Sequence, residues 1–446
     1  DEQGDPRGEF IRIQCEIARL ESTGEDPLHL RELRRLEGEL LDEYKEEWTA
    51  PLDRWQAFVR FHRGLLDEAS FRAKDFIENA PEILESVPTL AHLRLRGAQR
   101  KVEKLAEVPE LANITGLELP MSFPRRNDLR TLLSSPHLHR LKSLSLPNCL
   151  IGRNHVLPTL TPTFLELSHL NLQGNTIRLI GARLIQSLRQ GQLQSLDLAR
   201  NDLNFGFVNL MTEHDWQIQE LNLSKNRIHE IGFSGLAQST FSNSLKTLKL
   251  SSCDIQNSGL DLIRSTPGFP FLESLDLSNN SLTAGLRALE HCGGDRLRDI
   301  NLSNNPFDHF ELRNLLSVIG PAQLVRLNLS RSQIGRHQFG AVDLLGHDEP
   351  MPCLRELDLS GCNLGSPDLV RLVESPHFDS LERLILVGNQ LSERVAVALD
   401  KSTFLDQLQW LWVYPSASSW LYRTQPDEIY TGTWRKIKER LGDRMM

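Results

Sequence analysis

Cysteine is scarce in this chain of 446 residues, which has six cysteines and no Cys-x-x-Cys pair. So few cysteines in so long a chain do not predict a disulfide framework, and a reducing compartment is the simpler expectation. No apolar run approaches the roughly 18 residues of a membrane span, so we expect none. The opening DEQGDPRGEF has neither a basic nor an apolar segment and predicts no signal peptide. We therefore expect a cytoplasmic protein.

Basic residues are fewer than acidic ones, with 50 Lys and Arg against 59 Asp and Glu, and the formal net charge is −9. A nucleic-acid partner would require a basic face, so this balance argues against one. The chain has no GxxxxGK[ST] loop, no GxGxxG after a strand and no HExxH pair. His137 and His139 are interpreted as solvated or capping histidines rather than metal ligands. We therefore predict no enzyme, no catalytic residue, no metal and no cofactor.

The chain is rich in one internal repeat. Residues 193–203 read LQSLDLARNDL, and the pattern L-x-x-L-x-L-x-x-N-x-L recurs along most of the sequence. Clear copies start at residues 141, 167, 193, 218, 245, 272, 297, 324, 354 and 381, and weaker ones at 90, 114 and 408. From 114 to 408 the starts are about 27 residues apart. This pattern resembles the leucine-rich repeat signature.

Each position of the repeat has a physical reason. The L-x-L centre predicts a short strand, in which Leu196 and Leu198 point inward while Asp197 points outward. The stretches between strands have apolar residues at helical spacing, as in SPDLVRLVESP. We therefore predict an α/β fold, a leucine-rich repeat solenoid shaped as a horseshoe with a concave parallel sheet and convex helices. The repeat length and the helical backs resemble the ribonuclease-inhibitor-like class.

The ninth position of the repeat is usually Asn. A buried amide there can satisfy backbone groups of the turn that leaves the strand, and Cys in the same position is interpreted as a structural thiol. This predicted turn ladder comprises Cys149, Asn175, Asn201, Asn226, Cys253, Asn280, Asn305, Cys362 and Asn389.

Residues 1–86 do not follow the repeat and predict a mainly helical cap. The segments GDPRGEFIRIQCEIARL, the Leu- and Glu-rich helix ending EEW, and FHRGLLDEASF resemble the repeat-companion domain. That domain precedes leucine-rich repeats in bacterial proteins, notably those of planctomycetes. The resemblance implies an architecture and no activity. The motif that precedes GDPRGEF in that family is reduced here to DE, which implies a truncated domain.

We expect residues 87–414 to form about 12–13 repeats and residues 415–446 to form a C-terminal cap with a terminal helix, because a solenoid end needs cover. In LQWLWV, residues 408–413, the register places Trp410, Trp412 and then Tyr414 on the outward side. Two interpretations remain open. Trp420, Tyr422 and Trp434 of the cap pack on this row, or the row is an exposed aromatic anchor of the kind enriched at binding hot spots.

The outward strand positions are the predicted functional surface, because concave solenoid faces commonly bind proteins. We expect a monomer that binds a protein or peptide there without catalysis. An architectural or oligomerising role, or regulation of a partner enzyme such as a GTPase, remains an alternative. The predicted partner-binding residues are His169, Asn171, Asp197, Glu220, Asn222, Lys249, Asp276, Asp299, Asn301, Arg326, Glu356, Asp358, Arg383, Trp410 and Trp412.

Overall fold

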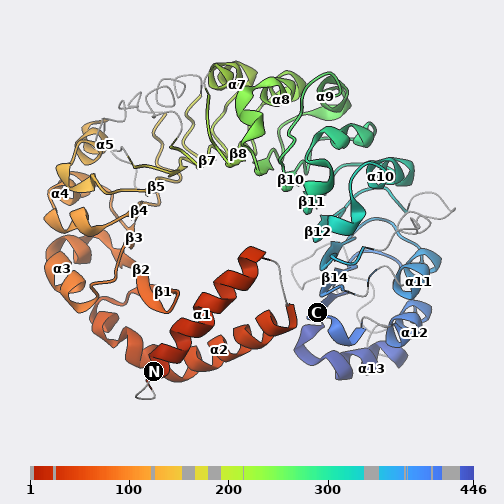
Figure 1. The fold of residues 1–446 in the computed structure, drawn as a ribbon, viewed down its shortest axis with the longest axis horizontal. Helices are drawn as coiled ribbons and strands as arrows, with labels where there is room; N and C mark the ends of the chain where they lie inside the picture. Colours follow the sequence, from red (N-terminus) through yellow and green to blue (C-terminus); the bar gives the residue numbers. More distant parts are fainter. Residues whose placement is uncertain are drawn as a thin grey trace. The chain divides into compact units, whose positions relative to one another are not determined.

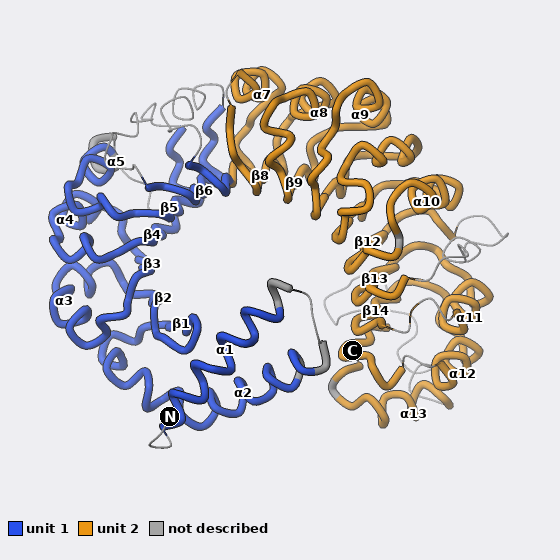
Figure 2. The backbone as a smooth tube through the Cα atoms, viewed as in Figure 1, with its two compact units in different colours: residues 1–196 blue, residues 197–446 orange. Residues whose placement is uncertain are grey.

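The computed structural model describes residues 5–23, 27–121, 126–152, 166–178, 192–213, 215–335, 351–375, 378, 380–402, 405–413 and 432–445. The chain divides into two compact units, Asp1–Leu196 and Asp197–Met446 (Figure 2). No helix within the described ranges is both long and apolar enough to cross a membrane.

Unit 1 begins with a pair of helices. They are α1 (Pro6–Thr23) and α2 (Pro27–Thr49), which pack on each other through a small apolar core. That core includes Ile13, Ile17 and Leu33, at the helical spacing that the sequence shows. There follow η1 (Ala50–Trp55), the antiparallel hairpin β1 (Phe58–His62) and β2 (Leu65–Arg72), and α3 (Ala73–Ser86).

The turn of this hairpin lies against α1. Gly64 has φ +80°, and its N–H donates to Oε1 of Gln14 at 2.5 Å. A Cβ at Gly64 would clash with Ile11, so the close approach requires glycine. Phe10 adds ring contacts with Trp48 and Phe61 at centroid distances of 4.9 and 5.5 Å. The helices and the hairpin therefore form one packed body.

The parallel sheet of unit 1 begins earlier than the repeat pattern indicates. Strand β2 pairs in parallel with β3, with Glu68 opposite His92, although residues 65–72 lack the repeat consensus. The sheet continues through β3 (His92–Arg96), β4 (Gly116–Glu118), β5 (Ser143–Ser145) and β6 (His169–Asn171). The connections contain α4 (Val102–Ala106), η2 (Pro109–Asn113), α5 (Arg126–Leu133) and η3 (Pro136–Leu138). Strand β7 (Ser195–Asp197) lies at the boundary of the two units.

Unit 2 is built from three-residue strands, most of which are followed, within the described residues, by a helix or a helical turn. Its strands are β8 (Glu220–Asn222), β9 (Thr247–Lys249), β10 (Ser274–Asp276), β11 (Asp299–Asn301), β12 (Arg326–Asn328), β13 (Glu356–Asp358), β14 (Arg383–Ile385) and β15 (Trp410–Trp412). Each pairs in parallel with the next, and equivalent repeat positions stand opposite each other. The register read from the sequence is therefore confirmed.

The helical elements of unit 2 cover one side of these strands (Figure 1). They are α7 (Phe205–Thr212), α8 (His229–Gln238), η6 (Thr240–Asn243), α9 (Gln256–Ile263), η7 (Leu286–His291), η8 (Gly294–Arg296), α10 (His309–Leu316), η9 (Pro321–Gln323), α11 (Ser366–Glu374), α12 (Glu393–Lys401), η11 (Leu405–Gln407), α13 (Gly432–Leu441) and η13 (Gly442–Arg444). The central residue of every strand, such as Leu275 or Leu357, is at most 2% exposed and packs on the helical side. The predicted parallel sheet with helices on one side is confirmed.

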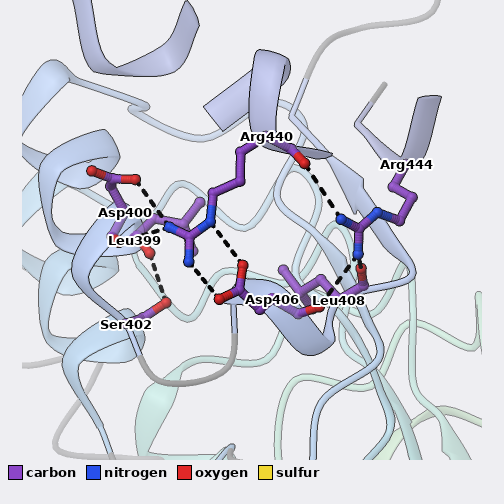
Figure 3. Close-up of polar contacts among 7 residues, drawn as sticks. All are labelled: Leu399, Asp400, Ser402, Asp406, Leu408, Arg440 and Arg444. Carbon is purple, nitrogen blue, oxygen red and sulfur yellow. Dashed lines mark hydrogen bonds and ion pairs between the residues drawn. The ribbon is translucent and has the colours of Figure 1, made fainter. Parts of the chain in front are cut away.

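Residues 432–445 cover the end of the last repeat. Helix α13 packs on α12, and Met445 forms a parallel bridge with Leu411. Arg440 donates from Nε and Nη2 to the two carboxylate oxygens of Asp406 at 2.7 and 2.6 Å, and Nη1 of Arg444 donates to the carbonyl of Leu408 at 2.9 Å (Figure 3). The hydrogen bond from Arg440 lowers the pKa of Asp406.

Candidate functional site

Most of the ninth-position amides bridge two repeats. Oδ1 of Asn280 accepts the N–H groups of Cys253 and Ile255 at 2.9 and 3.2 Å. Its Nδ2 donates to the carbonyls of Leu250 and Leu277 at 2.8 and 3.0 Å. The same geometry recurs at the buried Asn175, Asn226 and Asn305 and at the half-buried Asn389. Nδ2 of the buried Asn201 donates to the carbonyl of Leu198 in its own repeat at 3.0 Å. These amides make their hydrogen bonds within the fold and do not face a ligand.

The thiols in the same positions are equally occupied. The Sγ atoms of Cys149, Cys253 and Cys362 donate to carbonyls of the preceding repeat at 3.2, 3.2 and 3.1 Å. Burial raises the pKa of Cys253 to about 12 and that of Cys362 to about 11. A thiol that stays protonated at neutral pH is a poor nucleophile.

The side chains that point away from the helices form what we call the open strand face of unit 2, defined by the first and third residues of β8 to β15. All of them are exposed or half-buried. Of the predicted partner-binding residues, only His169 and Asn171 belong to unit 1. There, Nδ1 of His169 lies 2.8 Å from Oγ of Ser168, and Oδ1 of Asn171 accepts the N–H of Gln173 at 2.9 Å.

In β8, β10, β11, β12 and β13 the third residue has a structural role that the sequence reading missed. Oδ1 of Asp276 accepts the N–H of Ser278, and Oδ1 of Asp358 accepts the N–H of Ser360, both at 2.9 Å. Asn222, Asn301 and Asn328 accept equivalent bonds at 3.0–3.1 Å, and so does Asp197 at 2.9 Å. The recurring Asn-Leu-Ser and Asp-Leu-Ser triplets were the available signal, because Asn and Asp favour such turns.

A hollow of about 200 Å³ lies on the open strand face between β9 and β13. It brings together seven of the predicted residues with Ser274 and Asn328, and the strand centres form its floor. The predicted residues in it are Lys249, Asp276, Asp299, Asn301, Arg326, Glu356 and Asp358. Asp197, Glu220, Asn222, Arg383, Trp410 and Trp412 are also on unit 2 but do not line the hollow.

The charges of the hollow are unequal, with four carboxylates and two bases in its lining. Arg326 forms a two-pronged ion pair with Asp299, Nε to Oδ1 at 2.8 Å and Nη2 to Oδ2 at 2.7 Å. The hydrogen bond to Asp299, assisted by the charges of Asp299 and Glu356, raises the pKa of Arg326. Glu356 lies 3.7 Å from Arg383. The hollow therefore retains an excess of negative charge.

Comparison with known proteins identifies the repeat. Leucine-rich repeat family models match residues 241–263, 271–292 and 351–373, which include β9, β10 and β13. The chain contains leucine-rich repeats. No curated protein matches the sequence.

Two solved structures with leucine-rich repeats are similar to this chain. An internalin (InlF) from Listeria monocytogenes shares 18% identity over 72% of this chain and 81% of its own, with a TM-score of 0.43. TLR13, in a structure titled as its complex with ssRNA13, shares 18% identity over 78% of this chain, with a TM-score of 0.40. This chain spans 57% of the TLR13 chain. The assignment of leucine-rich repeats rests on the family models and on the strand register.

The outward aromatic row of the last repeat is partly described. Trp410 is 42% exposed, Trp412 is half-buried, and both lie on β15. Tyr414, Trp420 and Tyr422 lie outside the described residues. Trp434 is buried on α13, which packs on α12 of the helical side. The indole of Trp410 is therefore accessible on the open strand face.

Among the described residues, no group of three or more His, Cys, Asp or Glu side chains is placed to hold a metal ion. The hollow between β9 and β13, with Trp410 two strands beyond it, is the candidate site.

Proposed function

We propose that this chain is a non-enzymatic scaffold that binds a protein or peptide on the open strand face of unit 2, the face predicted from sequence to be concave. Leucine-rich repeat proteins are typically protein-interaction scaffolds, and their strand faces commonly provide the binding surface. The single observation that supports this site is the hollow between β9 and β13, which gathers polar side chains from five successive repeats.

The side chains of this face suit recognition better than catalysis. The cysteines with raised pKa values are buried in the turns or, for Cys292, at the end of η7, so they do not reach the hollow. Arg326 is held by Asp299 in a fixed orientation, which gives a partner a preformed pattern of charge. Preorganised charges contribute more to specificity and to the rate of association than to affinity.

The caps complete the proposal. We infer that the described parts of residues 1–86 and residues 432–445 cover the two ends of the repeat array, as terminal segments of solenoids must. The chain then acts as a monomer, with its strand face open to the partner.

Charge reversal on the face tests the proposed function. Tagged wild-type protein is used to capture partners from an extract of the organism that encodes it, in parallel with the Asp276→Lys and Arg326→Glu variants. We expect a partner that wild type captures and both variants lose. The matched control is Asp261→Lys, which reverses an exposed acid on α9 of the helical side and should capture normally. Capture that survives both reversals on the strand face would place the site elsewhere.

A further inference from the structure

The negative charge of the hollow exceeds what its turns require. Oδ1 of Asp358 accepts the N–H of Ser360 at 2.9 Å, and Oδ1 of Asn328 accepts the N–H of Ser330 at 3.0 Å in the preceding repeat. An amide and a carboxylate therefore serve this turn equally. Asp at position 358 adds a charge that the fold does not need.

Among the described residues, this charge also has no basic partner in an ion pair. Asp299 forms an ion pair with Arg326, and Oε2 of Glu356 lies 3.7 Å from Nη1 of Arg383. Within the described ranges, no ion pair joins Asp358 to a Lys, Arg or His, and its hydrogen bonds come from Ser360 alone. A cationic group placed beside Asp358 and Glu356 would therefore gain attraction without breaking the pair between Arg326 and Asp299.

An apolar surface lies on the next two strands, β14 and β15. Ile385 of β14 stands opposite Asp358 on one side and opposite Trp412 on the other. Trp410 exposes 42% of its surface at the same level of the sheet as Arg383. Since neighbouring strands are about 4.8 Å apart, the backbones of β13 and β15 are separated by about 10 Å.

We propose that this part of the open strand face recognises a protein segment that carries a Lys or Arg side chain and, about 10 Å from it, a large apolar side chain. The cationic group pairs with Asp358 and Glu356, and the apolar side chain packs on Ile385, Trp410 and Trp412. The charge complementarity selects a basic segment over an acidic one, and it opposes nucleic acid because phosphates would meet carboxylates. This inference rests on the proposed function and specifies its partner.

Selection from a random peptide library tests the proposal without a known partner. A phage-displayed dodecapeptide library is panned on the full-length wild-type chain, and the selected peptides are synthesised. We expect an enriched pattern of a basic residue near an aromatic or leucine residue. Fluorescence polarisation should then show at least 5-fold weaker binding to Asp358→Asn and at least 10-fold weaker binding to Trp410→Ala.

The variants are chosen to keep the fold. Asp358→Asn retains the turn bond, as Asn301 and Asn328 demonstrate, and it removes only the charge. Matched controls are Asp261→Asn on α9 and Phe310→Ala on α10, two exposed side chains of the helical side, and both should bind like wild type. Thermal unfolding of every variant checks that the chain remains folded.

The outcomes separate this proposal from the function on which it rests. Selected peptides that lack the basic and apolar pair, yet lose binding to Arg326→Glu, would overturn the inference and leave the proposed function standing. Peptides that bind every strand-face variant as tightly as wild type would overturn both. A library from which nothing is enriched would also count against both.

Discussion

Asn305 accepts the backbone N–H of Asn280 with its side-chain oxygen at 2.9 Å, and it donates from Nδ2 to the carbonyls of Leu277 and Leu302, each at 2.9 Å. One amide thus joins two repeats inside the protein. Both asparagine side chains are at most 1% exposed, so water cannot replace these bonds.

Removing this amide should destabilise unit 2. Asn305→Ala leaves buried backbone groups without partners, which costs about 1–3 kcal/mol of unfolding free energy. Urea denaturation followed by circular dichroism measures the change. The control is Asn314→Ala, an exposed residue on α10, which should unfold like wild type. Equal losses in the two variants would show that the ladder position has no special role.

Two glycines of unit 1 should respond in opposite directions to the same substitution. Gly64→Ala forces a left-handed backbone on alanine and drives its Cβ into Ile11, so we expect a loss of about 1–3 kcal/mol. Gly38 lies inside α2, where an added Cβ would meet nothing within 4 Å, so Gly38→Ala should stabilise by about 0.5–1 kcal/mol. Thermal melts of both variants measure this, and a stabilising Gly64→Ala would contradict the described packing of α1.

The buried thiols should make the protein sensitive to alkaline pH. The folded pKa values of about 12 for Cys253 and about 11 for Cys362 lie above the ordinary value of 9.0. At a pH between 9.0 and the folded pKa, the thiol is deprotonated in the unfolded state and protonated in the folded state. Stability is therefore full below pH 9 and falls as pH rises, by about 1.4 kcal/mol per pH unit for each thiol.

Serine variants check this assignment, since Ser332 already occupies the ladder position of one repeat and is 1% exposed. In urea titrations from pH 8 to 10.5, Cys253→Ser and Cys362→Ser together should lose stability less steeply than wild type. If the unfolding free energies of wild type and of the double serine variant fall equally with pH, the two thiols do not cause the loss.

The ion pair between Arg440 and Asp406 should hold α13 in place. Arg440→Ala is expected to speed amide hydrogen exchange in residues 432–441 and leave α8 and α9 unchanged. Because Arg440 lowers the pKa of Asp406, its contribution is present above the ordinary carboxyl pKa of 3.8 and is lost as pH falls below it. Exchange in the variant and in wild type should therefore converge at low pH, and a difference that persists there would exclude this pair as its cause.

The sequence predicted the repeat register well because its signal is local and periodic. Leu275 and its equivalents recur at fixed intervals, so their burial and the pairing of Ser274 with Asp299 followed directly. The parallel pairing of β2 with β3 was missed because Phe71 and Ala69 of β2 are buried without the leucine pattern. A local sequence pattern contains no information about such long-range pairing of strands.

The candidate site was predictable only as a column of positions. The sequence placed Asp299 and Arg326 on the same face, but their two-pronged pairing depends on side-chain conformation across neighbouring strands. The hollow depends on five repeats at once and has no signature in any one of them. By contrast, the turn bond of Asp358 could be predicted from the sequence, because the local triplet Asp-Leu-Ser favours it.

The turn bond that accepts either Asn or Asp makes surface charge and folding independent variables at each repeat that carries one of these residues there. A single-base exchange between the two residues rewrites the electrostatic pattern of the strand face one position at a time and leaves the backbone bond in place. A protein lineage that makes these exchanges can change its binding partner through intermediates that all remain folded. Directed evolution can use the same freedom, with a library of Asn and Asp at positions 197, 222, 276, 301, 328 and 358 that varies specificity while stability stays nearly constant.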